Sequence, residues 1–110
     1  HAVASHRPWK PDPFDQACLW LAKHTTTTAT VLTHHPAELY WQSGRQAWTP
    51  EDVDLDDPAG LARRRIFFIV VEPGPPDDPL RRFVESYPNR VRLKMSAGAR
   101  PDVRVYAVAW

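Results

Sequence analysis

The feature that most constrains the fold is a continuous apolar run near the middle of the chain. Residues 66–71 read Ile-Phe-Phe-Ile-Val-Val and are bounded by Arg65 and Glu72. Such a run of β-branched and aromatic residues is typical of a strand at the centre of a sheet covered on both faces. It is also far shorter than the roughly 20 residues that a membrane-spanning helix needs. The sequence therefore predicts an α/β domain built around a strand over residues 65–72.

Helical segments alternate with short strands along the rest of the chain. Asp12 and Pro13 form a helix-start signal, and apolar residues at helical spacing follow as far as His24. Further helices are expected over residues 37–43, 59–64 and 79–87, and further strands over residues 29–33, 46–48, 91–95 and 103–108. The last two strands are joined by about seven residues, too few for a helical crossover, so they form an antiparallel hairpin. We expect a three-layer α/β sandwich, a Rossmann-like half-fold with a mainly parallel five-stranded sheet that ends in this hairpin.

Length and composition limit the class of protein. The chain has 110 residues, with 43% hydrophobic and 25% charged side chains, which is typical of one globular domain. We expect an N-terminal arm over residues 1–11, which lack apolar periodicity, and a single α/β domain over residues 12–110. A formal net charge of +1 argues against nucleic acid as a partner. The lone cysteine, Cys18, lies on the apolar stripe of the first helix, so we expect a buried, unreactive thiol.

The carboxyl edge of the strands is where an open α/β sheet binds its ligands. Here Thr33, His34 and His35 follow the first strand, and residues 72–74 follow the central strand. A nucleotide site would need a glycine-rich turn after the first strand, but the sequence there is Thr-His-His-Pro. Adjacent histidines diverge, and no third imidazole or thiolate stands at ligand spacing, so neither a metal site nor a cofactor is expected.

Two interpretations of this histidine pair remain open. The histidines either bind an anionic sugar or lipid phosphate, better below about pH 6.5 where imidazole is charged, or they are structural. In the structural interpretation one of them caps the following helix, and the other faces solvent or packs on Trp41. No serine stands at a strand-to-helix elbow to act as a nucleophile, so hydrolytic catalysis is poorly supported.

Charged residues cluster by sign in two parts of the chain. Residues 51–57 form an acidic loop that lacks the central glycine and final glutamate of an EF-hand, which favours a solvated loop over a calcium site. Residues 81–110 hold seven basic side chains against two acidic ones. These cations either meet anionic lipid headgroups or an acidic partner, or are solvated charges that protect an edge strand from aggregation. They are Arg81, Arg82, Arg90, Arg92, Lys94, Arg100 and Arg104.

Several segments carry a resemblance to a known family. The run Ala17-Cys-Leu-Trp-Leu-Ala-Lys-His-Thr precedes Ala29-Thr-Val-Leu-Thr-His-His-Pro-Ala-Glu-Leu-Tyr-Trp-Gln-Ser-Gly-Arg-Gln-Ala, and the chain closes with Tyr87-Pro-Asn-Arg-Val and Val103-Arg-Val-Tyr. These segments resemble a W-L-x(n)-T helix, a V-x-T-x-x-P-x-x-L-Y-x-x-x-G-R strand–helix unit and a Y-P-x-R-F…V-x-V-Y segment. Such segments are found in the soluble domain that follows the transmembrane region of polytopic GT-C-class glycosyltransferases, of the dolichyl-phosphate-mannose and aminoarabinose-transferase types.

The resemblance implies a non-catalytic extracytoplasmic accessory domain of a membrane glycosyltransferase that uses lipid-linked sugar donors, at the outer face of a bacterial membrane. In such enzymes the catalytic acidic residues lie in loops of the membrane region, so no catalytic residue carries over to this chain. The implied partners are the transmembrane region of the parent chain and anionic lipid headgroups or a polyprenyl-phosphate sugar. The alternative is a free-standing α/β module that binds a small molecule or a protein.

Most motif residues of the strand–helix unit have an architectural interpretation, at a strand end, a helix start, a helix face or a helix end. Arg45 is the exception, because its fixed charge and donor fork make it a further candidate for ligand binding. It follows a helix whose end lies at the opposite edge of the sheet in an ideal crossover. Geometry therefore favours the turn of Thr33, His34 and His35 as the binding patch.

Overall fold

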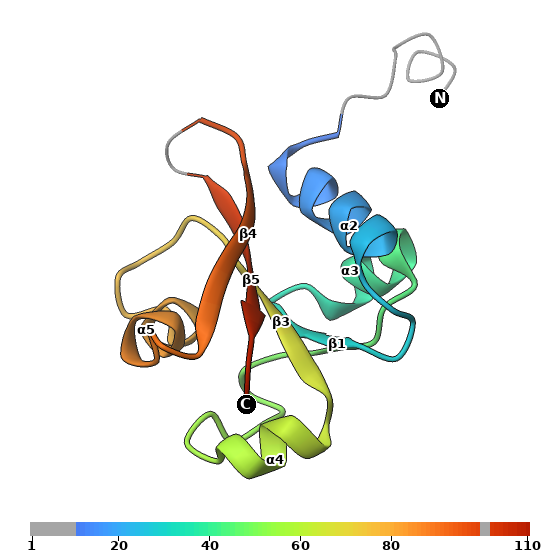
Figure 1. Ribbon diagram of the computed structural model, residues 1–110. Helices are drawn as coiled ribbons and strands as arrows, with labels where there is room; N and C mark the ends of the chain where they lie inside the picture. The colour runs from blue at the N-terminus through green and yellow to red at the C-terminus, as the bar shows by residue number, and fades with distance from the viewer. Residues whose placement is uncertain (1–10, 100–101) are drawn as a thin grey trace, which may run out of the picture.

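Helices and strands alternate through the chain in the predicted order (Figure 1). The computed structural model describes residues 11–99 and 102–110, so the expected N-terminal arm, apart from Pro11, and Arg100 lie outside the described residues. The elements are α2 (Pro13–His24), β1 (Thr30–Leu32), α3 (Pro36–Ser43), β2 (Ala47–Trp48), α4 (Pro58–Arg63), β3 (Ile66–Val71), α5 (Pro79–Ser86), β4 (Val91–Ala97) and β5 (Val103–Val108).

Proline marks the start of every one of these helices. Its fixed φ angle suits the first turn, and its missing N–H group costs nothing where no helical partner exists. Before three of these prolines stands an aspartate that accepts a hydrogen bond from the first turn, namely Asp12, Asp57 and Asp78. Before the fourth, at α3, stands His35, whose side chain makes no capping hydrogen bond. Local signals in the sequence therefore determine where the helices begin.

The five strands form one mixed sheet in the order β2-β1-β3-β5-β4. β1 pairs in parallel with β2 and β3, whereas β5 pairs antiparallel with both β3 and β4. The expectation of a mainly parallel sheet is therefore wrong, although β3 is the central strand as predicted. The physical reason lies in the hairpin: β5 buries Val103, Val105 and Val108, while β4 alternates apolar residues with Arg92 and Lys94. The apolar second strand takes the inner position, and its direction makes the pairing with β3 antiparallel.

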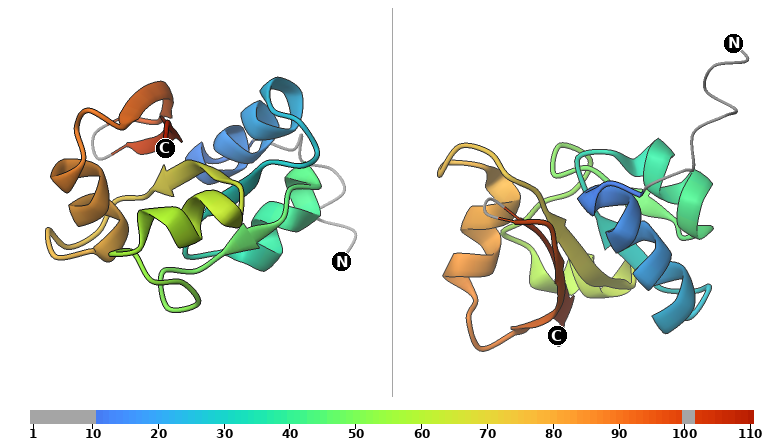
Figure 2. Two further views of the ribbon diagram at one scale, coloured as in Figure 1. Left: turned by 60° about the horizontal axis from the view of Figure 1, so that its bottom comes forward. Right: turned by 90° about the horizontal axis from the view of Figure 1, so that it is seen from above.

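Helices cover the sheet on both faces, which gives three layers (Figure 2). One buried cluster joins α2 and α3 to the sheet, and the other joins α4 and α5 to the opposite face. β3 supplies Val70 to the first cluster and Ile69 to the second, because successive residues of a strand point to opposite faces. No helix among residues 11–99 and 102–110 is long and apolar enough to cross a membrane.

Candidate functional site

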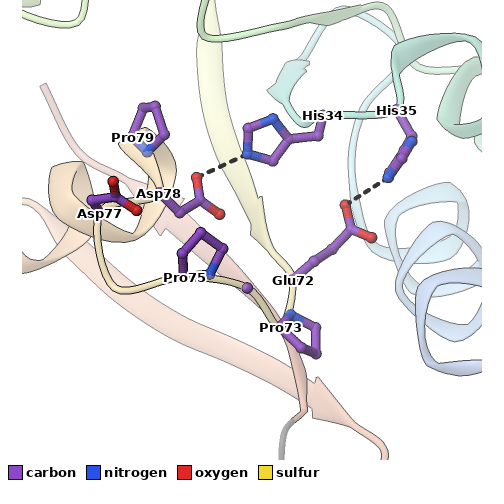
Figure 3. A pocket seen from close by; sticks show the side chains of 9 residues that line it. His34, His35, Glu72, Pro73, Pro75, Asp77, Asp78 and Pro79 are labelled. Carbon is purple, nitrogen blue, oxygen red and sulfur yellow. Dashed lines mark hydrogen bonds and ion pairs between the residues drawn. The ribbon is translucent and has the colours of Figure 1, made fainter.

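The carboxyl ends of β1 and β3 meet at one edge of the sheet, beside an open cavity of about 420 Å³. We call it the His34–His35 cavity. It lies between the turn after β1 and the loop that joins β3 to α5 (Figure 3). Its lining residues are His34, His35, Glu72, Pro73, Gly74, Pro75, Asp77, Asp78 and Pro79. The two segments that the sequence places at this edge are therefore neighbours in the structure.

His34 is bound to the carboxylate of Asp78. Its Nε2 atom lies 2.8 Å from Oδ1 of Asp78, and the two side chains point toward one another in Figure 3. Asp78 is only 7% exposed and also accepts a hydrogen bond of 3.0 Å from the N–H of Leu80, as the N-cap of α5. One buried carboxylate thus holds both the imidazole and the start of a helix.

His35 forms the second pair, with Glu72 at the end of β3. Its Nε2 atom lies 3.4 Å from Oε2 of Glu72, and its ring meets the edge of the Phe14 ring. Oε2 of Glu72 is buried and receives no hydrogen bond from the described residues. Burial raises the pKa of Glu72, and the nearby imidazoles of His35 and His34 oppose that rise without cancelling it.

Thr33 is fully buried and holds the turn in place instead of facing the cavity. Its N–H donates to the carbonyl of Trp48 at 3.0 Å, and its Oγ1 accepts from the N–H of His35 at 3.1 Å. This hydroxyl acts at the start of α3, where the structural interpretation of the histidine pair places a histidine side chain as the cap; the His35 side chain makes no capping hydrogen bond. The same interpretation has the other histidine either face solvent or pack on Trp41. Among the described ring contacts neither His34 nor His35 packs on Trp41, which is 88% exposed, and both imidazoles are partly exposed.

Arg45 does not belong to this cavity. Its side chain is buried and donates to the hydroxyl of Thr25, to the carbonyls of Ala22 and Thr25 at the end of α2, and to the carbonyl of Ser43 at the end of α3. A guanidinium supplies several donors in a fixed fork, which suits the orphan carbonyls at two helix ends. The structure therefore separates Arg45 from Thr33, His34 and His35.

The His34–His35 cavity is rich in hydrogen-bond acceptors and poor in donors. Three of its side chains are carboxylates, namely Glu72, Asp77 and Asp78, against two imidazoles that already face carboxylates. Three of its lining residues are prolines, which have no N–H to offer a phosphate. This balance favours a ligand that donates hydrogen bonds, such as a hydroxyl-rich or amine-bearing molecule. Phosphate binding by the histidine pair stays a prediction, which the neighbouring carboxylates oppose.

Asp78 and Glu72 are the cavity residues whose pairing with the histidines the sequence analysis missed. A signal existed, because the N-cap of α5 follows β3 directly and so must lie at the same sheet edge. Among the described residues, no group of three or more His, Cys, Asp or Glu side chains is placed to hold a metal ion. The chain matches no protein-family model, and no curated protein or solved structure matches it either.

Proposed function

We propose that this chain is a non-catalytic extracytoplasmic accessory domain of a membrane glycosyltransferase that uses lipid-linked sugar donors. The proposal starts from the resemblance of the strand–helix segment, which here is one structural unit of β1, the following turn and α3. Its motif residues have architectural roles: Thr33 and Leu39 are buried, Gly44 ends the helix with a φ of 72°, and Arg45 joins two helix ends. A domain of this kind shields or shapes the acceptor side of the reaction and supplies no catalytic group.

The observation that carries the proposal is an exposed aromatic pair on α3. Tyr40 is 54% exposed and Trp41 is 88% exposed, and Leu19 on the neighbouring helix α2 is 44% exposed. Amphipathic aromatic rings are enriched at protein interfaces and at the membrane–water boundary, where one end is apolar and the other is wet. The proposed partner of Tyr40 and Trp41 is the transmembrane region of the parent chain.

The proposal includes two finer points. The segment β1–α3–β2–α4–β3 is proposed as a Rossmann-like half-fold, which is supported by three adjacent parallel strands joined through helices. The domain is also proposed to lie at the outer face of a bacterial membrane. That location follows from the resemblance and has the same test as the function.

The first test is to read the coding sequence upstream of His1. Eight or more apolar spans of about 20 residues would support the proposal, and a chain that starts close to His1 would overturn it. The second test uses the full-length protein with Tyr40→Ser and Trp41→Ser together. We expect glycosyl transfer to fall with the domain still folded, while Leu93→Ser, which alters an exposed leucine on β4, leaves transfer unchanged.

The His34–His35 cavity favours a second candidate function, a free-standing module that binds a small molecule. A thermal-shift screen of sugars, sugar phosphates and nucleotides tests it, with Asp77→Asn as the cavity variant and Asp54→Asn in the acidic loop as the control. Stabilisation by a sugar that Asp77→Asn removes would support this function. A polyprenyl-phosphate analogue that binds better at about pH 5.5 than at about pH 8, only while both histidines are present, would instead make the histidines an anion site.

A further inference from the structure

A second open cavity, of about 450 Å³, lies at the outer edge of the sheet. It is formed by the segment that leads from α5 into β4 and by the end of β5. Its lining residues are Pro88, Asn89, Arg90, Val91, Arg92, Lys94, Ala107, Val108 and Ala109. The lining thus holds three cationic side chains and no carboxylate. We call it the Arg90–Lys94 cavity.

The strand geometry explains why three cations share this cavity. Arg90 comes just before β4, Arg92 lies on that strand, and alternate residues of an extended strand lie on one face. Lys94 follows on the same strand, at the position where the register with β5 shifts. Opposite Arg92 in the register lies Ala107, whose short side chain leaves a hollow there. The backbone is held in place, since the carbonyl of Arg90 accepts a hydrogen bond of 2.7 Å from the N–H of Ala109.

A β-bulge in β4 leaves Lys94 outside the pairing with β5. The register shifts between Leu93 and Met95, so Lys94 has no partner residue on β5. β4 is moreover the edge strand (Figure 1), and the outer N–H groups of an edge strand have no partner strand. The strand that carries Arg92 and Lys94 therefore has unpaired N–H groups of its own at the sheet edge.

These three cations have no anionic partner among residues 11–99 and 102–110. Two other arginines of the same region are occupied: Arg104 pairs with Asp102 at 3.0 Å, and Arg81 donates to the carbonyl of Glu72 at 3.0 Å. Three like charges around one hollow repel each other, and a bound anion would relieve that repulsion. The arrangement thus points to a ligand of several negative charges.

We propose that the Arg90–Lys94 cavity binds a phosphate-bearing anion, either a soluble diphosphate or the headgroup of an anionic membrane lipid. The guanidinium forks match phosphate oxygens in pairs, and the ammonium of Lys94 adds a point charge. A single carboxylate would leave two of the three cations unneutralised. No aromatic side chain lines the cavity to stack a base, so nucleic acid does not fit it. The site rests on these side chains and goes beyond the proposed accessory function.

The test measures binding of the 110-residue chain to two probes. The probes are inorganic pyrophosphate, followed by calorimetry, and phosphatidylcholine vesicles with and without phosphatidylglycerol, followed by co-sedimentation. The cavity variant is Arg92→Gln with Lys94→Gln, and the control is Arg63→Gln with Lys23→Gln. Both variants remove one arginine and one lysine charge from exposed positions, but only the first pair lines the cavity.

We expect the cavity variant to bind at least about tenfold more weakly than the wild type, and the control to bind within about twofold of it. Binding should also weaken as salt rises, because the contacts are ionic. Binding to pyrophosphate would identify a soluble ligand. Binding only to vesicles that contain phosphatidylglycerol would identify a lipid headgroup.

Three results would overturn the site: no binding to either probe, equal binding by the cavity variant and the wild type, or an equal loss in the control. Thermal unfolding of each variant checks that the fold is kept, and Arg90→Gln is a second cavity variant with the same expected direction. The upstream coding sequence tests the accessory function independently. A chain without upstream spans that still binds pyrophosphate would keep this site and lose that function.

Discussion

Arg45 is expected to be one of the most sensitive positions for stability, although it lines neither of the two cavities. It is only 7% exposed and makes four hydrogen bonds, three of them to carbonyl oxygens at the ends of α2 and α3. Arg45→Met keeps an apolar stem of similar length and removes the guanidinium. The carbonyls of Ala22, Thr25 and Ser43 then lose their side-chain donor.

The expected cost follows from these contacts. A hydrogen bond to a charged group contributes about 1.5–3 kcal/mol, but such contributions do not add fully when water reaches part of the site. We therefore expect Arg45→Met to lower the free energy of unfolding by about 3 kcal/mol, roughly a third of the stability of an ordinary domain. Arg45→Lys should recover only part of this loss, because one ammonium cannot reach both helix ends as a planar fork does.

Urea denaturation followed by tryptophan fluorescence measures this effect. A loss of about 3 kcal/mol moves the midpoint by about 2 M for a domain of this size. Arg63→Met is the control, since that side chain is 74% exposed and its nearest carboxylate, on Asp57, lies 3.9 Å away. It should change stability by less than about 0.5 kcal/mol. A loss below about 1 kcal/mol for Arg45→Met would refute the view that this guanidinium joins the two helices.

Three further predictions concern single positions. Because burial raises the pKa of Glu72, the folded state holds its proton to higher pH than the unfolded state, so the free energy of unfolding falls as pH rises above the ordinary value of 4.5. Glu72→Gln should therefore be more stable than the wild type at neutral pH in urea titrations, with the difference closing in acid; no difference at neutral pH would refute this. Burial raises the pKa of the Cys18 thiol to about 12, so iodoacetamide should label it only in denaturant, and labelling of the folded protein would contradict this. Gly98→Ala should lower the stability measured by thermal unfolding more than Gly44→Ala does. Both glycines have positive φ, but only at Gly98 would the new Cβ lie 2.8 Å from Pro13. Equal losses would show that the close contact with Pro13 is unimportant.

The elements of the fold were predictable because their signals are local. Asp12 and Pro13 mark the start of α2 through contacts within one turn, and Gly44 ends α3 through its own backbone conformation. The pairing of the hairpin with β3 is a contact between residues far apart in the chain, and periodicity does not encode it. The contrast between apolar β5 and charged β4 was nevertheless present in the sequence. This contrast indicates that β5, and not β4, takes the inner position beside β3.

The candidate site was predictable in position but not in chemistry. The rule for the carboxyl edge correctly places His34 and His35 beside Glu72, because it depends only on strand direction. The partner of His34 depends on how the loop before α5 folds back over β3, which brings Asp78 within 2.8 Å of that imidazole. A histidine considered alone indicates an anion site in acid. The same histidine bound to a buried carboxylate indicates an acceptor-rich cavity instead.

The net charge of the chain says little about where its charged side chains lie. A value of +1 argues against strong attraction of the whole chain to a long polyanion, since that attraction grows with the number of cations that meet it. It does not exclude a local anion site, because the sum combines the carboxylates beside His34 with the cations beside Arg92, which line different cavities. The two cavities share no lining residue, so each presents its own charge to a ligand. The domain therefore offers an acidic cavity at the carboxyl edge of its parallel strands and a basic cavity at its hairpin edge. A ligand that bears both an amine and a phosphate would find a partner for only one of these two groups in either cavity.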